Sequence, residues 1–151
     1  MHKYKWAAFI IICAAILGFV KPAFAYEAGI IKTVRGQVRI ERGAGNLEAK
    51  VGDPVQENDR VSTQVGSSVG ISLSDETLLS LGPNSAMVID RYSFDSVTRE
   101  GQVETSILKG TLRYVTGLIG QLQPMAIKVT TPTATIGIRG TEFIVEVLDV
   151  K

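Results

Sequence analysis

The chain has 151 residues, with 16 Lys and Arg against 15 Asp and Glu, and a formal net charge of +1. This length suits one domain, and so balanced a charge gives no electrostatic footprint for nucleic acid or for an anionic membrane surface. The sequence contains one His and one Cys, which restricts the catalytic and metal-binding chemistry open to it.

Residues 1–25 have the features of a secretory signal peptide. A basic start precedes the apolar run 6–20, and Ala23 and Ala25 are the small residues that signal peptidase requires before a cut at Tyr26. Because the apolar run is shorter than the ~20 residues that span a bilayer, we expect cleavage and no membrane insertion afterwards. The protein is therefore expected in the periplasm or outside the cell.

Cleavage would remove His2 and Cys13, the His and the Cys of the sequence. Residues 26–151 would then lack a Ser–His or Cys–His nucleophile pair and the usual ligands of zinc and copper. Three lysines leave as well, so that 13 basic residues face 15 acidic ones. We therefore expect a protein that is not an enzyme, with no catalytic residues, no cofactor and no metal site.

The segment 26–151 predicts a single all-β domain. Apolar and polar residues alternate, as in half-buried strands, over residues 36–41, 69–74, 111–115 and 126–130. Turn residues recur roughly every 8–12 positions, for example at 82–84 and at Lys109-Gly110. We expect about eleven or twelve short strands, arranged as a small β-sandwich or as a twisted, β-solenoid-like domain.

Gly52, Asp53 and Pro54 predict a tight turn, in which the carboxylate bonds to nearby backbone and the proline presets φ. A calcium loop is the alternative reading, but the acids here lack the alternating spacing of such a loop. Asp75 and Glu76 predict the tip of a hairpin with both carboxylates in solvent. Because Glu76 would be strained in a type I′ turn, a different turn or a longer loop is expected.

The stretch 115–125 is apolar but not strand-like, since two glycines and a proline interrupt it. We expect a loop that covers the core. An exposed apolar patch that marks a partner site is the alternative.

The segment "TPTATIGIRGTEFIVEVL" spans residues 131–148. Pro132 marks a strand start or an edge, and Gly137 allows a bulge or a reversal before Arg139. Residues 143–148 are apolar on both faces, which predicts either a central strand, the most buried in the domain, or a sheet edge that awaits a partner.

Arg139 has two readings. Its guanidinium is expected to bond to carbonyl oxygens or to an acid such as Glu142, or else to contact a partner. The candidate binding residues are therefore Arg139, Gly140, Thr141, Glu142 and Ile144.

Five fragments in order, "GQVRI", "VGDPVQENDRVST", "GSSVGISLSDETLLSLGPNSAM", "LKGTLRYV" and "TPTATIGIRGTEF", resemble the FecR domain. This is the periplasmic domain of iron-dicitrate sensor and anti-sigma regulator proteins, and the resemblance covers residues 29–148. It implies a non-enzymatic binding module of the cell envelope, part of sensing or signalling, whose partner is another envelope protein.

The sequence departs from the family at three places. The family usually carries Asp-Gly where Asp75-Glu76 stands, and only a few residues precede the apolar run, so control of a sigma factor is not carried over. Family members commonly continue past the last strand with a further hairpin, whereas the sequence ends at Lys151. Either the domain is minimal or its last edge is open, and an open apolar edge would favour strand addition by another chain.

Two other functions stay open. A structural or adhesive component could self-associate through the terminal strand, so a homo-oligomer is not excluded. A hydrolase of cell-wall glycans could use two carboxylates, taken from Asp75, Glu76 and Asp90.

Overall fold

The computed structural model describes residues 26–148; the predicted signal peptide, with Ala23 and Ala25, lies outside the described residues. Strands make up most of the described chain, which confirms the all-β prediction and the expected number of strands. The strands are β1 (Glu27–Arg35), β2 (Val38–Arg42), β3 (Gly45–Glu48), β4 (Pro54–Gln56), β5 (Arg60–Thr63), β6 (Ser68–Leu73), β7 (Leu78–Leu81), β8 (Ala86–Phe94), β9 (Gly101–Val115), β10 (Ile127–Thr130), β11 (Thr135–Gly137) and β12 (Glu142–Val147). The helical elements are α2 (Leu118–Leu122) and the 3-10 turn η1 (Pro124–Ala126). Between residues 26 and 148, no helix has the length and apolarity needed to cross a bilayer.

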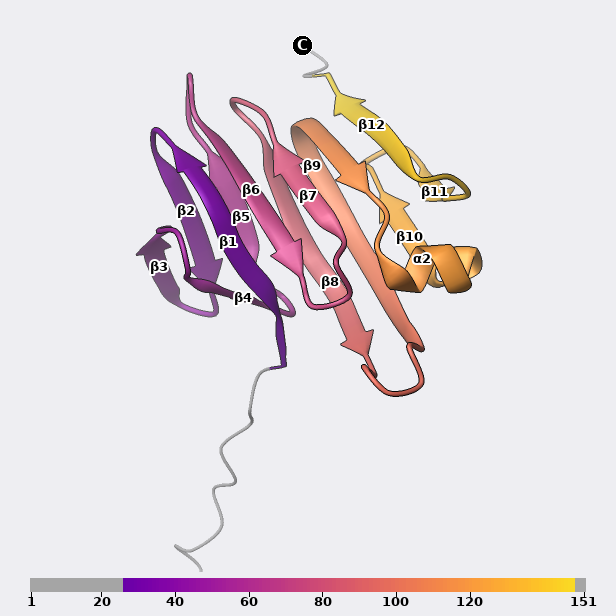
Figure 1. Ribbon diagram of the computed structural model, residues 1–151. Coiled ribbons are helices and arrows are strands. Elements are labelled where there is room, and N and C mark those ends of the chain that lie inside the picture. The colour runs from indigo at the N-terminus through magenta and orange to yellow at the C-terminus, as the bar shows by residue number, and fades with distance from the viewer. Residues whose placement is uncertain (1–25, 149–151) are drawn as a thin grey trace, which may run out of the picture.

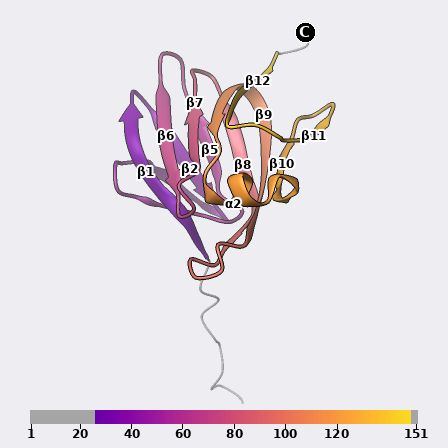
Figure 2. The same cartoon turned by 45° about the vertical axis from the view of Figure 1, so that its right-hand side comes forward.

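The twelve strands of residues 26–148 belong to one sheet that curls over itself as a half-barrel (Figures 1 and 2). The path through the sheet is β3-β2-β5-β8-β9-β7-β6-β1-β4, and β10 and β12 both join it at β9. The sheet thus has two leaves that meet at β9. One leaf contains β3, β2, β5, β8, β10 and β11, and the other contains β7, β6, β1, β4 and β12. These leaves face each other as in a sandwich, but they are continuous through β9, and the strands do not stack as the rungs of a solenoid.

Strand β9 is the element that both leaves share. Its first part pairs with β8 and, in parallel, with β10, and its last part pairs with β7 and β12. Gly110 lies between the two parts with φ +80°, a left-handed conformation that favours glycine. The expected turn at Lys109-Gly110 is therefore wrong, because the glycine bends one long strand instead of ending it.

The core lies between the two leaves and takes side chains from both. The alternation seen in the sequence is confirmed, since its apolar members are all buried: Val38, Ile40, Val69, Ile71, Leu73, Leu112, Tyr114, Ile127 and Val129. Complete burial of one such aliphatic side chain stabilises the fold by about 1.5–3 kcal/mol. Packing of this kind holds the domain together.

The segment after β9 forms α2 and η1 in place of the expected loop. Parallel strands need a crossover connection, and this segment joins β9 to its parallel neighbour β10. Ile119 is fully buried in the core, whereas Met125 is 97% exposed. The segment therefore covers the core with one side and leaves the other in solvent.

Replacing Gly110 with Ala should lower the free energy of unfolding by about 2–4 kcal/mol. The added Cβ would lie 2.6 Å from Ser85 Cα and would collide with Ser85 Oγ, which accepts a 2.9 Å hydrogen bond from the Thr111 N–H. Urea denaturation measures the loss. Gly43→Ala is the control, because Gly43 also has a positive φ but open space around it, and it should cost only about 1–2 kcal/mol. Equal losses for the two variants would contradict the close packing at Gly110.

Candidate functional site: the C-terminal edge

Strand β12 forms an edge of the sheet. It pairs antiparallel with β9 from Glu142↔Val115 to Val147↔Gly110, and among residues 26–148 no strand pairs with its other side (Figure 1). The Thr116 N–H donates a 2.8 Å hydrogen bond to the Thr141 carbonyl. Thr116 and Thr141 are thus a hydrogen-bonded pair, and hydrogen-bonded pairs alternate with non-hydrogen-bonded pairs along the two strands. The backbone groups of every second residue, Glu142, Ile144 and Glu146, therefore point away from β9 without a strand partner.

The side chains of β12 also differ from one face to the other. Val145 is buried, and Phe143 and Val147 are half-buried against the core. Ile144 is 65% exposed and Leu148 is 73% exposed. The expectation that this would be the most buried strand is wrong, because no second layer formed by the described residues covers its outer face. The other expectation, a sheet edge, fits the structure.

The reversal before β12 is anchored to the core by one residue. Thr116, which is itself buried, donates from Oγ1 to the Gly140 carbonyl at 2.9 Å and from its N–H to Thr141 as described above. Gly140 has φ +157° and Arg139 is exposed beside it. The backbone of this reversal is therefore held in place while its side chains face solvent.

Arg139 does not bond to Glu142. The acid pairs instead with Arg113, whose Nε donates to Glu142 Oε1 at 2.7 Å, and both side chains are about half-exposed. Within residues 26–148 Arg139 takes part in no salt bridge. The predicted Arg139–Glu142 contact is therefore wrong. Arg113 lies opposite Ile144 on the neighbouring strand β9, and from there its side chain pairs with Glu142. A partner contact by Arg139 stays a prediction.

Pro132 and Gly137 lie in the neighbouring β10–β11 hairpin. The Thr131 N–H donates to the Ala134 carbonyl at 2.7 Å, and Thr131 Oγ1 accepts the Ala134 N–H at 3.0 Å. Pro132 is in this turn and Gly137 ends β11, and both are exposed. The structure thus gathers these two residues and the candidate residues 139–144 on the side of the sheet where the β10–β11 hairpin and β12 lie (Figure 2).

The turn Gly52-Asp53-Pro54 lies elsewhere, before edge strand β4. Asp53 Oδ2 accepts the Lys50 N–H at 2.8 Å, and Gly52 has φ +93°. Nearby, Asp59 is fully buried and accepts two hydrogen bonds from Arg42, at 2.8 and 2.7 Å. These oxygens are thus used within the protein, and in the described part of the chain no three His, Cys, Asp or Glu residues are grouped to hold a metal.

Asp75 is a buried hub, so the expectation of a solvated carboxylate is wrong. It is 0% exposed. Its carboxylate accepts hydrogen bonds from Thr77 Oγ1 at 2.8 Å and Tyr92 OH at 3.3 Å, and its carbonyl accepts the Leu118 N–H at 2.7 Å. Asp75 thereby joins the β6–β7 turn to β8 and to α2. Asp followed two residues later by Thr signalled the local turn, but its burial depends on α2, which is remote in sequence.

Glu76 occupies the last position of a three-residue hairpin loop. Its N–H donates to the Leu73 carbonyl at 3.0 Å, and the Leu73 N–H donates to the Thr77 carbonyl at 2.9 Å. Glu76 is exposed and has φ +69°. Such loops place a left-handed residue at this point, for which glycine is favoured. Glu76 is therefore a strained residue at a position that favours glycine.

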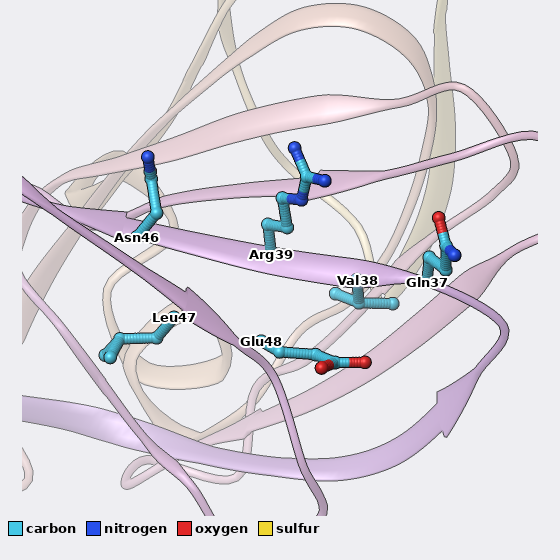
Figure 3. A pocket seen from close by; sticks show the side chains of 6 residues that line it. All are labelled: Gln37, Val38, Arg39, Asn46, Leu47 and Glu48. Atoms are coloured by element: carbon cyan, nitrogen blue, oxygen red, sulfur yellow. The ribbon is translucent and has the colours of Figure 1, made fainter.

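Two hollows in the described part of the chain lack the acids considered for hydrolysis. A cavity of about 190 Å³ is lined by residues of β2 and β3 and by Gln37. In Figure 3 the charged ends of Arg39 and Glu48, which line it, point away from each other. This volume is below the roughly 300–1,000 Å³ of typical ligand sites. A larger, open hollow of about 590 Å³ lies beside the β8–β9 turn. Asp75, Glu76 and Asp90 line neither of these.

The hub also contains two tyrosine hydroxyls, of Tyr92 and Tyr114. Burial raises the pKa of both hydroxyls well above the ordinary value of 10.0, and the nearby Asp75 charge raises each further. Among the described residues the Tyr114 hydroxyl has no hydrogen-bond partner. Tyr114 also stacks on Phe143 of β12, with ring centroids 4.9 Å apart. The hub is therefore in contact with the C-terminal edge.

Replacing Glu76 with Gly should raise the free energy of unfolding by about 1 kcal/mol, because glycine adopts a left-handed conformation without a steric penalty. Urea denaturation at neutral pH gives the value. Ser74→Gly in the same loop is the control, since Ser74 does not have a positive φ, and it should not stabilise. If both variants lose stability equally, Glu76 is not strained.

Stability should fall as pH rises above 10.0, because the unfolded tyrosines ionise there while the folded ones resist ionisation. The contribution is fully present below that pH and is lost as pH rises toward the folded-state pKa. Tyr114→Phe should reduce this decline and should cost little at pH 7, since its hydroxyl has no partner. Denaturation curves from pH 7 to 11.5 test this. An unchanged alkaline slope in the variant would contradict the assignment.

Comparison with known proteins addresses the family. The family model described as FecR protein matches residues 59–151, which include β5 to β12, the Asp75 hub and the C-terminal edge. Comparison with curated proteins and with solved structures found no match. Since the family model covers more than half of the chain, the protein belongs to the FecR family.

Proposed function

We propose that this protein is an exported interaction module that binds another protein of the cell envelope through its C-terminal edge and performs no catalysis. FecR is a regulatory family, and membership indicates a role in envelope sensing or signalling. The candidate signal peptide at residues 1–25 supports export to the periplasm or beyond.

The open side of β12 is the observation that carries this proposal. Its outward backbone groups have no strand partner among residues 26–148, and Ile144 provides an exposed apolar contact between them. An exposed sheet edge is a ready template for an added strand, in which backbone hydrogen bonds supply affinity. Thr116 fixes the reversal at Gly140, so the edge is presented in a defined position. Such binding requires complementarity and no bond-breaking chemistry.

The hydrolase alternative has less support. A glycosidase needs two carboxyl groups that flank one sugar, about 5 to 9.5 Å apart across a cleft. Asp75 is buried and hydrogen-bonded inside the domain, whereas Asp90 is exposed and accepts a 2.6 Å hydrogen bond from Ser106 Oγ. These two acids therefore lie in different surroundings. The adhesive alternative uses the same edge with a second copy as partner.

A pull-down from envelope extract tests the proposal. We expect the processed protein to enrich a partner that Ile144→Lys recovers at roughly tenfold lower yield or less, because an apolar contact worth about 1.5–3 kcal/mol is lost. Arg139→Ala tests the second predicted contact. Val97→Lys is the control, since Val97 is 89% exposed in the β8–β9 turn, at the other end of β9 from β12 (Figure 1).

Circular dichroism must first establish that each variant is folded. Two results would contradict the proposal. One is that the wild-type protein enriches nothing above a blank resin; the other is that Ile144→Lys and Val97→Lys retain the partner equally.

A further inference from the structure

We propose that the C-terminal edge binds an added strand whose three outward side chains are basic, apolar and basic in that order. We also propose that the two acids of this edge, Glu142 and Glu146, disfavour pairing with a second copy of this chain. This inference rests on the proposed function and specifies the chemistry of the partner. It is drawn from the outer face of β12.

The outer face of β12 has one apolar residue between two acids. Glu142, Ile144 and Glu146 alternate along the strand, and all three are exposed. Glu142 is partly neutralised by Arg113 at 2.7 Å. Glu146 forms no salt bridge with any residue between 26 and 148. The edge thus presents a net negative charge around an apolar centre.

The ladder geometry places the partner's side chains directly against this pattern. Because the same three residues direct their N–H and C=O groups outward, each would form a hydrogen-bonded pair with one residue of an added antiparallel strand. Residues directly opposite lie about 4.5–5.5 Å apart at Cβ and interact. The partner's residues opposite Glu142 and Glu146 should therefore be Lys or Arg, and the residue opposite Ile144 should be apolar.

The partner's alternate residues would point the other way, toward the core. There they would meet Phe143 and Val147, which are half-buried, beyond which no strand of the described chain continues the leaf. Ile138, in the link from β11 to β12, is largely buried nearby in the same core cluster. These inward positions of the partner should therefore be apolar or Thr.

A second copy of this chain does not satisfy the pattern. Two β12 strands paired antiparallel, with Ile144 opposite its copy, would place Glu142 opposite Glu146 twice. Like charges directly opposite destabilise a strand pair, whereas opposite charges stabilise it. The two acids therefore protect the exposed edge against self-pairing. A strand with basic residues opposite both acids would instead form a favourable charge pair at each position.

Two model peptides test the charge preference. TKVIVKT has the outward pattern proposed here, and TEVIVET differs only at the two charged positions. We expect the lysine peptide to bind the processed protein about tenfold more tightly in low salt, with the difference shrinking as salt screens the exposed charges. Glu146→Lys should narrow or reverse the preference. Fluorescence anisotropy of labelled peptides provides both affinities.

Ile144→Pro tests whether binding occurs by strand addition. Proline removes the outward N–H at residue 144, yet it leaves the hydrogen bonds of Phe143 and Val145 to β9, and proline is tolerated on the solvent side of an edge strand. This variant should bind neither peptide. Equal binding of the two peptides by the wild-type protein, or binding of neither, would overturn the inference.

Self-association is measured separately by sedimentation. We expect the wild-type protein to be monomeric at neutral pH, and the double variant Glu142→Gln, Glu146→Gln to self-associate more strongly. A wild-type dimer that Ile144→Pro dissociates would overturn the inference and favour a second copy as the occupant. These outcomes are distinct from the pull-down: a partner lost with Ile144→Lys, together with peptides that bind equally, would leave the proposed function standing without its charge selectivity.

Discussion

The bend of β9 at Gly110 is the constraint on which the rest of the structure depends. One strand can serve both leaves only if its direction changes, and the positive φ of Gly110 together with its contact to Ser85 provides that change. Since β9 is paired on both sides in each half, the sheet must extend past it in both leaves. The leaves then end at β11 and at β12, and these strands do not pair with each other. The half-barrel stays open on this side because of that arrangement.

A chain of contacts connects the open edge to the core. Asp75 holds the start of α2 through Leu118, and Thr116, two residues earlier, holds Gly140 and Thr141. Tyr114 stacks on Phe143 of β12. An exposed edge in a small domain would otherwise be free to fray, so these contacts keep β12 in one geometry. A preordered edge loses less conformational entropy when a partner binds, which suits the proposed binding function.

Much of the fold could be predicted from the sequence because its signals are local. Alternation at Val38 and Ile40, or at Leu112 and Tyr114, reports burial of one strand face directly. The errors concern residues whose surroundings come from remote segments. Asp75 is buried against α2, where its carboxylate accepts a hydrogen bond from the Ile119 N–H, 44 positions away in the sequence. Gly110 bends a strand because Ser85 lies against it, although in sequence it resembles a turn.

The candidate site shows the same division. The terminal strand could be recognised, but an apolar pattern on both faces does not distinguish a central strand from an edge that a partner covers. Only the order of strands around β9 settles this for residues 142–147. Arg113, the residue that pairs with Glu142, lies 29 positions away. No pattern within the segment 131–148 identifies Arg113 as the partner of Glu142, so Arg139, which is close in sequence, was the expected partner.

Amide hydrogen exchange of β12, followed by NMR, tests the central claim that this strand is an open edge. The free protein should show alternation, with fast exchange at Glu142, Ile144 and Glu146, whose N–H groups point away from β9, and slow exchange at Phe143, Val145 and Val147. A bound partner strand should slow the first set. Uniform protection along β12 in the free protein would contradict the account, because the outward amides would then already be hydrogen-bonded.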